Sequence, residues 1–189
     1  NFSSPLNITI ENTEGKTKEY KVLVYAFTGL PVMYINTEND TEITSKEEYV
    51  NAHLRIVEDI YTRSGEIFES DVTIKGRGNS TWSLPKKPYA LKFDKKTSLL
   101  GEPKDKSWVL LANYTDKTNL RNEASFFMGR ISNLEWTPRT HFVELFMNEV
   151  YCGTYQLCEK IKIADSRVNI TDDGYLMEID QPDRIGPED

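Results

Sequence analysis

The chain has 189 residues, 38% of them hydrophobic and 11% aromatic, and a formal net charge of −7. This is enough apolar material for a packed core and too much for a disordered chain. No apolar run approaches the roughly 18 residues that a membrane-spanning helix needs, and the acidic balance argues against general nucleic-acid binding. Cys152 and Cys158 are predicted to be free thiols, because an extended run of six residues holds them too far apart for a disulfide. Two histidines are too few for a histidine metal site.

The first segments to show strand character are residues 7–10 and 20–27. A polar loop with Gly15 at its turn joins them, so we predict a hairpin. Residues 30–35 are apolar and open at Pro31, which suits the start of a strand. An acidic surface loop follows over 36–46.

A strict alternation marks the next strand. Val50, Ala52, Leu54 and Ile56 alternate with polar residues, and this period of two indicates a half-buried strand. Residues 72–75 and 89–93 are predicted to form a strand pair around a glycine turn, and 108–112 are predicted to form a near-continuous apolar strand.

One helix is predicted after these strands. Its apolar residues recur at spacings of four, three, four and three, which makes one stripe that we expect to face inward. The stripe consists of Leu120, Ala124, Phe127, Ile131 and Leu134. Thr115 or Asp116 can cap the helix, and Pro138 lies beyond its end.

Strand character returns after the helix. Residues 142–147 and 151–157 surround Asn148-Glu149 as a predicted hairpin, and 174–180 form a last apolar strand. About eight or more strands therefore accompany a single substantial helix. Short connections favour hairpins over crossovers, so the predicted class is α+β with a mostly antiparallel sheet.

Charge is concentrated in residues 75–96. Seven basic residues stand there against one acid, Asp94, so this segment carries +6 and the rest of the chain −13. Charge separated in this way is typical of a solvated face or of an anion site. A glycine turn between two strands favours the anion site, and phosphate is the anion we expect.

The turn reads Gly76-Arg77-Gly78-Asn79-Ser80. Two glycines let backbone amides approach a ligand closely, and the Arg77 fork suits phosphate oxygens. An ordinary β-turn explains the same residues. Lys92 alternates with Leu91 and Phe93, so it points to the other face of its strand. A lysine there is either a phosphate ligand, as in kinases, or an exposed strand lysine.

Longer phrases of the chain resemble the CotH-like kinase family, named for a spore coat protein. The matching phrases are GRGNSTW (76–82), PKKPYALKFD (85–94), LLGEPKDKSWVLLANYTDKTNLRNEASF (99–126), WTPRTHFVELFMNEVYCGTYQLCEKIKI (136–163), RVNI (167–170) and GYLMEID (174–180). The resemblance implies an amino-terminal, nucleotide-binding lobe over residues 29–180 and a loose tail over 181–189. Residues 1–28 look like trailing strands of an immunoglobulin-like module.

The family resemblance implies an atypical protein kinase that binds ATP and phosphorylates serine or threonine on partner proteins. In this family the catalytic aspartate and the acids that bind Mg²⁺ lie downstream of the GYLMEID-like strand. We therefore expect no catalytic residue and no metal ligand in this chain, which would make it inactive by itself and leaves open whether it is part of an enzyme. The expected fold is the amino-terminal lobe of an atypical kinase.

The resemblance also suggests roles for single residues. Arg77, Asn79 and Ser80 would hold phosphates at the turn, and Lys92 would contact the α and β phosphates. Glu123 is the candidate ion-pair partner of Lys92, although we favour its interpretation as an exposed helix glutamate. The other expected nucleotide-binding residues are Glu159, Met177 and Glu178. Lys86 and Lys87 would add positive electrostatic potential at this site or face an acidic substrate.

Two other functions compete with the kinase lobe. Relatives of the family occur in spore coats and on bacterial surfaces, so the chain could belong to a non-catalytic surface or coat protein. We expect it at the cell surface, secreted or in a spore coat. A third possibility is that the basic strand pair binds a phosphorylated glycan or another anionic polymer without any nucleotide.

Overall fold

The structure is a computed structural model that describes residues 6–22, 28–58, 67–171 and 173–178. The chain divides into two compact units, Asn1–Leu30 and Pro31–Asp189. The elements are β1 (Leu6–Glu11), β2 (Thr17–Val22), β3 (Val32–Thr37), η1 (Glu38–Asp40), β4 (Val50–Val57), β5 (Ile67–Gly76), η2 (Ser80–Ser83), β6 (Tyr89–Thr97), β7 (Asp105–Leu111), α1 (Arg121–Ile131), β8 (Thr140–Met147) and β9 (Val150–Glu159), where η marks a 3₁₀ helix.

The first unit holds the antiparallel hairpin β1–β2. Its turn contains Gly15 at φ 79°, a left-handed conformation that glycine adopts without strain. The side chain of Asn12 accepts hydrogen bonds from the N–H groups of Glu14 and Lys16. The predicted hairpin is confirmed, although residues 23–27 of its second strand lie outside the described residues. The immunoglobulin-like module stays a prediction.

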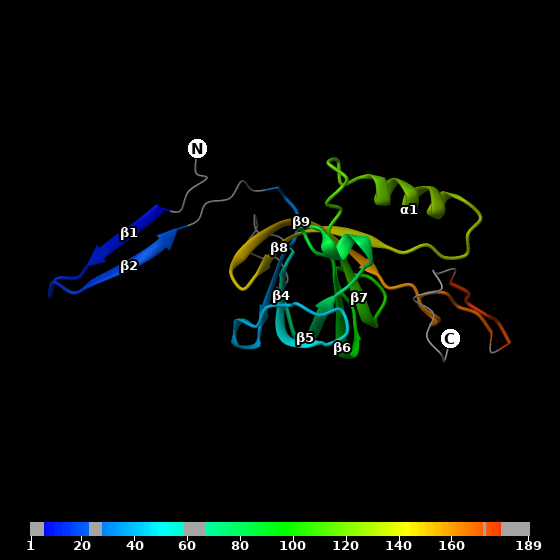
Figure 1. Cartoon of the computed structure of the whole chain (residues 1–189), viewed down its shortest axis with the longest axis horizontal. Helices are drawn as coiled ribbons and strands as arrows, with labels where there is room; N and C mark the ends of the chain where they lie inside the picture. Colours follow the sequence, from blue (N-terminus) through cyan, green and yellow to red (C-terminus); the bar gives the residue numbers. More distant parts are fainter. Residues whose placement is uncertain (1–5, 23–27, 59–66, 172, 179–189) are drawn as a thin grey trace. The chain divides into compact units, whose positions relative to one another are not determined.

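The second unit is a closed barrel of seven strands in the order β3-β4-β5-β6-β7-β9-β8 (Figure 1). Every neighbouring pair is antiparallel except β3 and β8, which pair in parallel and close the barrel. The predicted α+β class with a kinase-like amino-terminal sheet is therefore wrong. The described part of the chain is mostly β, with 45% of its residues in strands and 11% in helices. The prediction failed because local patterns reveal strands but not which distant strands meet.

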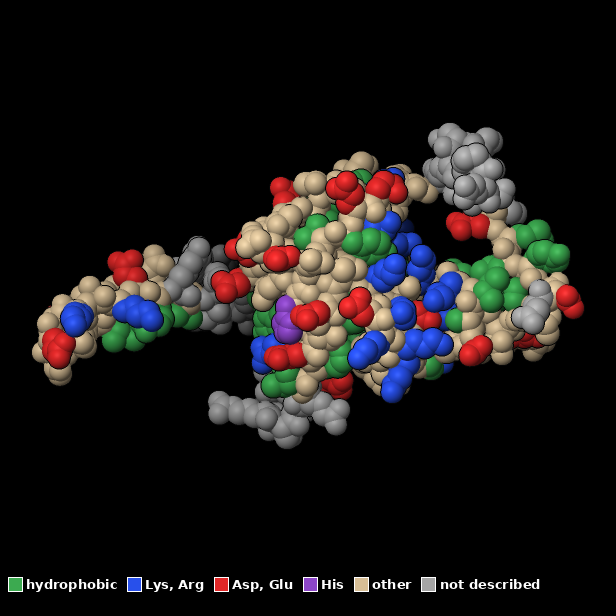
Figure 2. Space-filling view, turned by 90° about the horizontal axis from the view of Figure 1, so that it is seen from below, with side chains coloured by type: hydrophobic (Ala, Val, Ile, Leu, Met, Phe, Trp, Pro, Cys, Tyr) green, Lys and Arg blue, Asp and Glu red, His purple; other side chains and the backbone are tan. Residues whose placement is uncertain are grey.

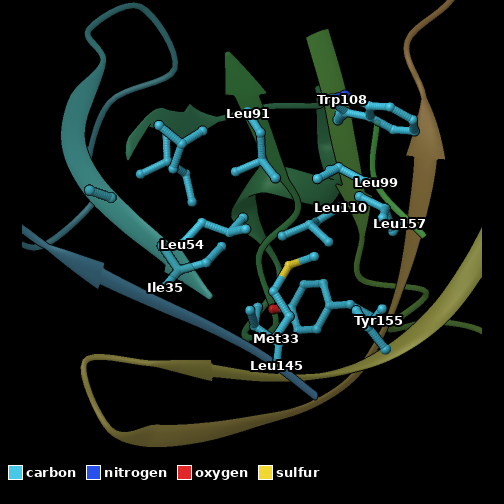
Figure 3. Close-up of a cluster of buried hydrophobic side chains, with 14 of the residues drawn as sticks. Met33, Ile35, Leu54, Leu91, Leu99, Trp108, Leu110, Leu145, Tyr155 and Leu157 are labelled. Carbon is cyan, nitrogen blue, oxygen red and sulfur yellow. The ribbon is translucent and has the colours of Figure 1, made fainter. Parts of the chain in front are cut away.

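The barrel interior forms the hydrophobic core (Figure 3). Met33 and Ile35 of β3, Leu54 of β4 and Leu110 of β7 are each 0% exposed, and Trp108 is 1% exposed. The alternation predicted for β4 is confirmed, because its apolar positions point inward while its polar ones face solvent. Closure leaves no sheet edge unpaired, so each strand contributes one side to this core.

The hairpin β8–β9 turns at Asn148 and Glu149, as predicted. Both residues have positive φ, 47° and 64°, which is typical of the tight turns that match strand twist. The Asn148 side chain accepts a 2.8 Å hydrogen bond from the N–H of Thr37 at the end of β3. This hydrogen bond therefore also connects the β8–β9 turn to β3, which closes the barrel by pairing with β8.

The helix α1 lies beside β8 and β9 (Figure 1). Asp116 accepts a 2.8 Å hydrogen bond from the N–H of Arg121, the first helical residue, so the predicted cap is confirmed. The predicted inward stripe is wrong, because Leu120, Phe127 and Ile131 are 57%, 52% and 61% exposed. The side of the helix that meets the rest of the unit carries Glu123, which hydrogen-bonds to Thr140 and Gln156, and the buried Gly129, which packs against Thr137.

The last predicted strand is also wrong over the part that can be described. Residues 174–178 form no strand, while residues 179 and 180 lie outside the described residues. The pairing needed for a strand depends on a neighbour, and the closed barrel offers no free edge.

Candidate functional site

The basic segment does not form one site, because its cations are distributed over three environments. Lys86 and Lys87 hold backbone oxygens. Nζ of Lys86 donates a 2.5 Å hydrogen bond to the carbonyl of Thr154 and lies over the ring of Tyr155, and burial lowers the pKa of this lysine. Nζ of Lys87 donates to the carbonyl of Trp82 at 2.7 Å. Lys86 therefore attaches the 80–88 loop to β9, whereas Lys87 stabilises the loop internally.

Lys92 belongs to the second environment, the outer surface of the barrel. Its neighbours Leu91 and Phe93 are 1% and 2% exposed and point into the core, so the predicted outward direction of Lys92 is confirmed. Its ammonium group approaches the ring of Tyr49 at 5.7 Å, and Lys75 approaches the same ring at 4.8 Å. Lys92 lines a shallow polar groove of about 440 Å³ that crosses the outside of strands β3 to β6.

Exposed lysines continue along this outer surface. On the face seen in Figure 2, Lys and Arg side chains gather in one area. Lys95 and Lys96 on β6 are exposed, and so are Lys104 and Lys106 at the start of β7. Within the described residues none of these four lysines has a carboxylate partner. They form a solvated cationic surface outside the barrel.

The glycine turn is explained by packing. A Cβ atom on Gly76 would lie 2.4 Å from the ring of Trp82, and one on Gly78 would lie 2.2 Å from Oγ1 of Thr81. Gly78 also has φ 82°. The space that a ligand would need is therefore filled by the side chains of η2. Asn79 and Ser80, two predicted phosphate ligands, are exposed beside this turn.

Arg77 occupies the third environment, a cavity of about 730 Å³ outside the barrel wall. Apolar residues supply much of its lining, together with a few charged groups. The cavity is lined by Arg77, Val109, Phe126, Pro138, Cys158, Glu159, Lys160, Ile161, Leu176, Met177 and Glu178. The structure therefore brings together four predicted site residues, Arg77, Glu159, Met177 and Glu178. Lys92 is not among them.

The electrostatics of Arg77 distinguish it from the other cations. Its guanidinium is half-buried, and burial lowers the pKa of this group. Within the described residues it has no carboxylate partner. Its close neighbour Cys158 has a pKa raised to about 12 by burial, so that thiol is neutral and supplies no charge. A partly desolvated cation without a counter-ion favours binding of an anion.

Glu159 lines the same cavity but has protein partners. Its side chain is fully buried and forms ion pairs with Arg167 at 2.5 Å and Arg139 at 2.8 Å. The guanidinium of Arg167 lies 5.0 Å from the ring centre of Trp108. Glu159 therefore stabilises the wall of the cavity, and its charge is neutralised before any ligand arrives. Sequence reasoning gave no role to Arg139 or Arg167, although both lie in phrases that match the family, 136–163 and 167–170.

Glu123 is directed at the barrel instead of at Lys92. Its carboxylate accepts hydrogen bonds from Thr140 and from Gln156, the second at 3.1 Å, and it pairs with Arg130 within the helix. The structure does not bring Glu123 and Lys92 together. These contacts attach α1 to β8 and β9. The same helix contributes Phe126 to the lining of the Arg77 cavity.

Comparison with known proteins identifies the family. A family profile described as CotH kinase protein matches residues 74–188, which is more than half of the chain. The chain belongs to the CotH kinase protein family. The matched region of this CotH-family chain begins in β5 and includes the turn, η2, α1 and the whole lining of the Arg77 cavity. No curated protein matches the chain closely enough to count as a relative.

Two searches of the described residues bear on ligands and membranes. In residues 6–22, 28–58, 67–171 and 173–178, no group of three or more His, Cys, Asp or Glu side chains is arranged to hold a metal ion. None of the helices in those same ranges is both long and apolar enough to cross a membrane.

Proposed function

We propose that this CotH-family chain is the nucleotide-binding lobe of a serine/threonine protein kinase, with Arg77 as its phosphate ligand. The observation that carries the proposal is the half-buried Arg77 guanidinium, which has no carboxylate partner in the described chain and lines a cavity of about 730 Å³. Ligand cavities of about 300–1,000 Å³ with apolar walls and few polar groups are typical of small-molecule sites. ATP fits this description.

Different residues of the cavity lining suit the phosphates and the base of a nucleotide. Arg77 and Lys160 supply positive charge for the phosphates. Val109, Phe126 and Met177 offer apolar surface against which a purine can pack. Glu178 is the remaining polar candidate and would accept a hydrogen bond from the base. Neither Asn79, Ser80 nor Lys92 lines this cavity, so we do not assign them to the nucleotide.

ATP binding by the 189-residue chain tests the proposal. In isothermal titration without metal, we expect Arg77→Ala to weaken ATP binding about 10- to 100-fold, because a charge-assisted hydrogen bond contributes roughly 1.5–3 kcal/mol. Arg77→Lys should recover only part of the loss, since lysine lacks the planar fork. Lys92→Ala is the matched control and should change the affinity less than threefold.

Two results would count against this assignment, and a third would contradict the expected inactivity of the chain. Absence of ATP binding by the unsubstituted chain would refute the proposal for this protein. If Lys92→Ala weakened ATP binding and Arg77→Ala did not, the phosphates would be assigned to the outer groove that Lys92 lines. Transfer of labelled phosphate by the chain alone would contradict the expectation that it is inactive without further acidic residues.

The alternative is a non-catalytic surface or coat protein, and the family's association with the spore coat supports it. A specific observation also favours binding of an anionic polymer, namely the exposed Lys95, Lys96, Lys104 and Lys106 without carboxylate partners in the described chain. If a polyanion binds, and Lys95→Ala/Lys96→Ala weakens it while Arg77→Ala does not, this alternative is preferred.

A further inference from the structure

The segment that follows β9 holds two isoleucines toward solvent. Ile161 and Ile163 are 59% and 52% exposed. Lys162 lies between them and is held on the barrel side, because its Nζ atom lies 3.3 Å from the buried carboxylate of Asp105. The ion pair therefore attaches this segment to the start of β7, while the apolar side chains before and after Lys162 stay in contact with water.

Backbone hydrogen bonds hold the same segment in place. The N–H of Val168 donates to the carbonyl of Lys162, and the N–H of Ala164 donates to the carbonyl of Val168, both at 3.2 Å. Within this turn the buried Arg167 forms its ion pair with Glu159. The exposure of the two isoleucines is therefore part of an ordered structure, and exposed apolar surface that a fold maintains in this way marks an interaction site.

Exposed lysines surround the Asp105–Lys162 ion pair. Two of them flank Asp105 in the chain, two precede Thr97, which pairs with Asp105 in the register of β6 and β7, and one precedes Ile161. These five lysines are Lys104, Lys106, Lys95, Lys96 and Lys160. The exposed acids in the same stretches and in the cavity lining are Asp94, Asp165 and Glu178. Five lysines against three acids leave the surface around the isoleucines positive.

The apolar surface extends beyond the two isoleucines. Met177 is 86% exposed and lines the Arg77 cavity together with Ile161. On the face seen in Figure 2, the area of Lys and Arg side chains adjoins an area of hydrophobic side chains. This combination suits an anionic lipid surface, because apolar groups enter the headgroup region while ammonium groups attract the lipid phosphates. A soluble polyanion would use the lysines alone and would leave the isoleucines in water.

We propose that Ile161, Ile163 and the five lysines around them form a surface that binds an anionic phospholipid bilayer. Two isoleucines bury little apolar area, so binding should be reversible and should depend on the lysines. Salt should weaken it, because the attraction between lysines and anionic lipids is screened over a Debye length. The proposal does not rest on ATP binding, since Ile163, Lys104 and Lys106 do not line the Arg77 cavity.

Co-sedimentation of the 189-residue chain with vesicles tests the proposal. We expect binding to phosphatidylcholine vesicles that contain about 30% phosphatidylglycerol, and a weakening of about tenfold or more between about 0.1 and 0.5 M NaCl. Vesicles of phosphatidylcholine alone should bind much less. A chain that does not bind the anionic vesicles at the lower salt concentration overturns the proposal. If it binds soluble polyphosphate but no vesicles, the lysines belong to a polyanion site and the bilayer is excluded.

A paired lysine variant separates local charge from net charge. Lys104→Ala/Lys106→Ala should weaken binding to the anionic vesicles about 10- to 30-fold, because each lysine near such a surface contributes about fivefold. Lys16→Ala/Lys18→Ala is the matched control, since it removes two exposed lysines of the same spacing from the first unit. Equal weakening by the two double variants would contradict a defined binding surface.

Substitution of Ile163 tests the apolar contact. Ile163→Glu should weaken vesicle binding at least about tenfold, because it removes apolar area and adds a negative charge. Val150→Glu is the matched control, since Val150 is 65% exposed and begins β9 at the end away from Ile161. Circular dichroism checks that both variants fold. If the two variants bind equally well, the isoleucines do not contact the lipid and the proposal is refuted.

Fluorescence tests the same contact without adding a charge. The emission of an Ile163→Trp variant should shift to the blue on anionic vesicles, measured against the unsubstituted chain with its own tryptophans, because the new indole enters the headgroup region. A Val150→Trp variant should show no such shift. A shift of equal size in both variants would rule out the proposed orientation of the chain on the bilayer.

Discussion

Glu159 and Arg167 have fully buried side chains whose charged atoms lie 2.5 Å apart, with the Arg167 guanidinium stacked near Trp108. Arg77 differs from them because it is half-buried and has no carboxylate partner in the described chain. Arg77 and Arg167 carry the same charge but therefore have different roles. A neutralised buried ion pair holds the cavity wall, whereas the unpaired cation remains available for a ligand.

Arg167→Ala tests the structural role of the buried pair. We expect the free energy of unfolding to fall by about 3–5 kcal/mol, because removing one partner leaves a buried carboxylate with less compensation. Urea denaturation measures the change. Lys95→Ala, an exposed lysine, should stay within about 0.5 kcal/mol of the unsubstituted chain. A loss below about 1 kcal/mol for Arg167→Ala would show that Arg139 alone neutralises Glu159.

At the scale of elements, α1 depends on polar contacts at its start. Asp116 accepts hydrogen bonds from the N–H of Arg121 and from the hydroxyl and N–H of Thr118. The hydrogen bond from the Arg121 N–H is the main cause of a lowered pKa for Asp116, followed by the one from the Thr118 hydroxyl. The ionised carboxylate therefore stabilises the helix start, where the N-cap residue Leu120 forms no side-chain hydrogen bond of its own.

Asp116→Ala should lower the midpoint of thermal unfolding by roughly 2–4 °C near neutral pH, the usual effect of losing a cap in a chain of this size. Because the pKa is lower in the folded state, the stabilisation is present above about pH 4 and is lost as the pH falls through the folded pKa. The difference between Asp116→Ala and the unsubstituted chain should therefore shrink in acid. Thermal unfolding at pH 7 and pH 3 measures it, with Thr115→Ala as control. A difference that grows in acid would contradict this sign.

At the scale of the whole molecule, closure of the barrel is the feature that organises the second unit. The parallel pair β3–β8 joins strands that lie far apart in the chain, and Asn148 hydrogen-bonds to Thr37 across 111 residues. Closure removes both sheet edges and allows every strand to bury one face. It also leaves the functional candidates on the outside, since the interior is filled by side chains.

Native-state amide exchange tests closure directly. If the barrel is closed, amides in β3 and β8 should be protected about as strongly as those in β5 and β6, because all four strands are paired on both sides. In an open sheet β3 and β8 would be edges, and half of their amides would exchange early. Fast exchange confined to these two strands would contradict the closed barrel.

Local patterns predicted much of this structure. The alternation around Leu54 and around Lys92 correctly indicated which side chains point inward, and Asn148-Glu149 correctly indicated a turn. These features depend on near neighbours in the chain. The helix stripe failed because the same apolar spacing serves a core or an interface with another molecule, and the hydrogen bonds of Glu123 to β8 and β9 could not be foreseen.

The candidate site was predictable only in part. The basic segment 75–96 contains Arg77, but sequence alone could not separate it from the lysines that hold carbonyls or face solvent. The amino-acid sequence by itself determined most of the strands, the helix and membership of the CotH family. The tertiary structure alone decided the closed barrel, the outward face of α1 and the placement of a half-buried, unpaired Arg77 in the same cavity as Glu159, as far as the described residues show. Those outcomes depend on contacts between distant segments, which no local pattern records.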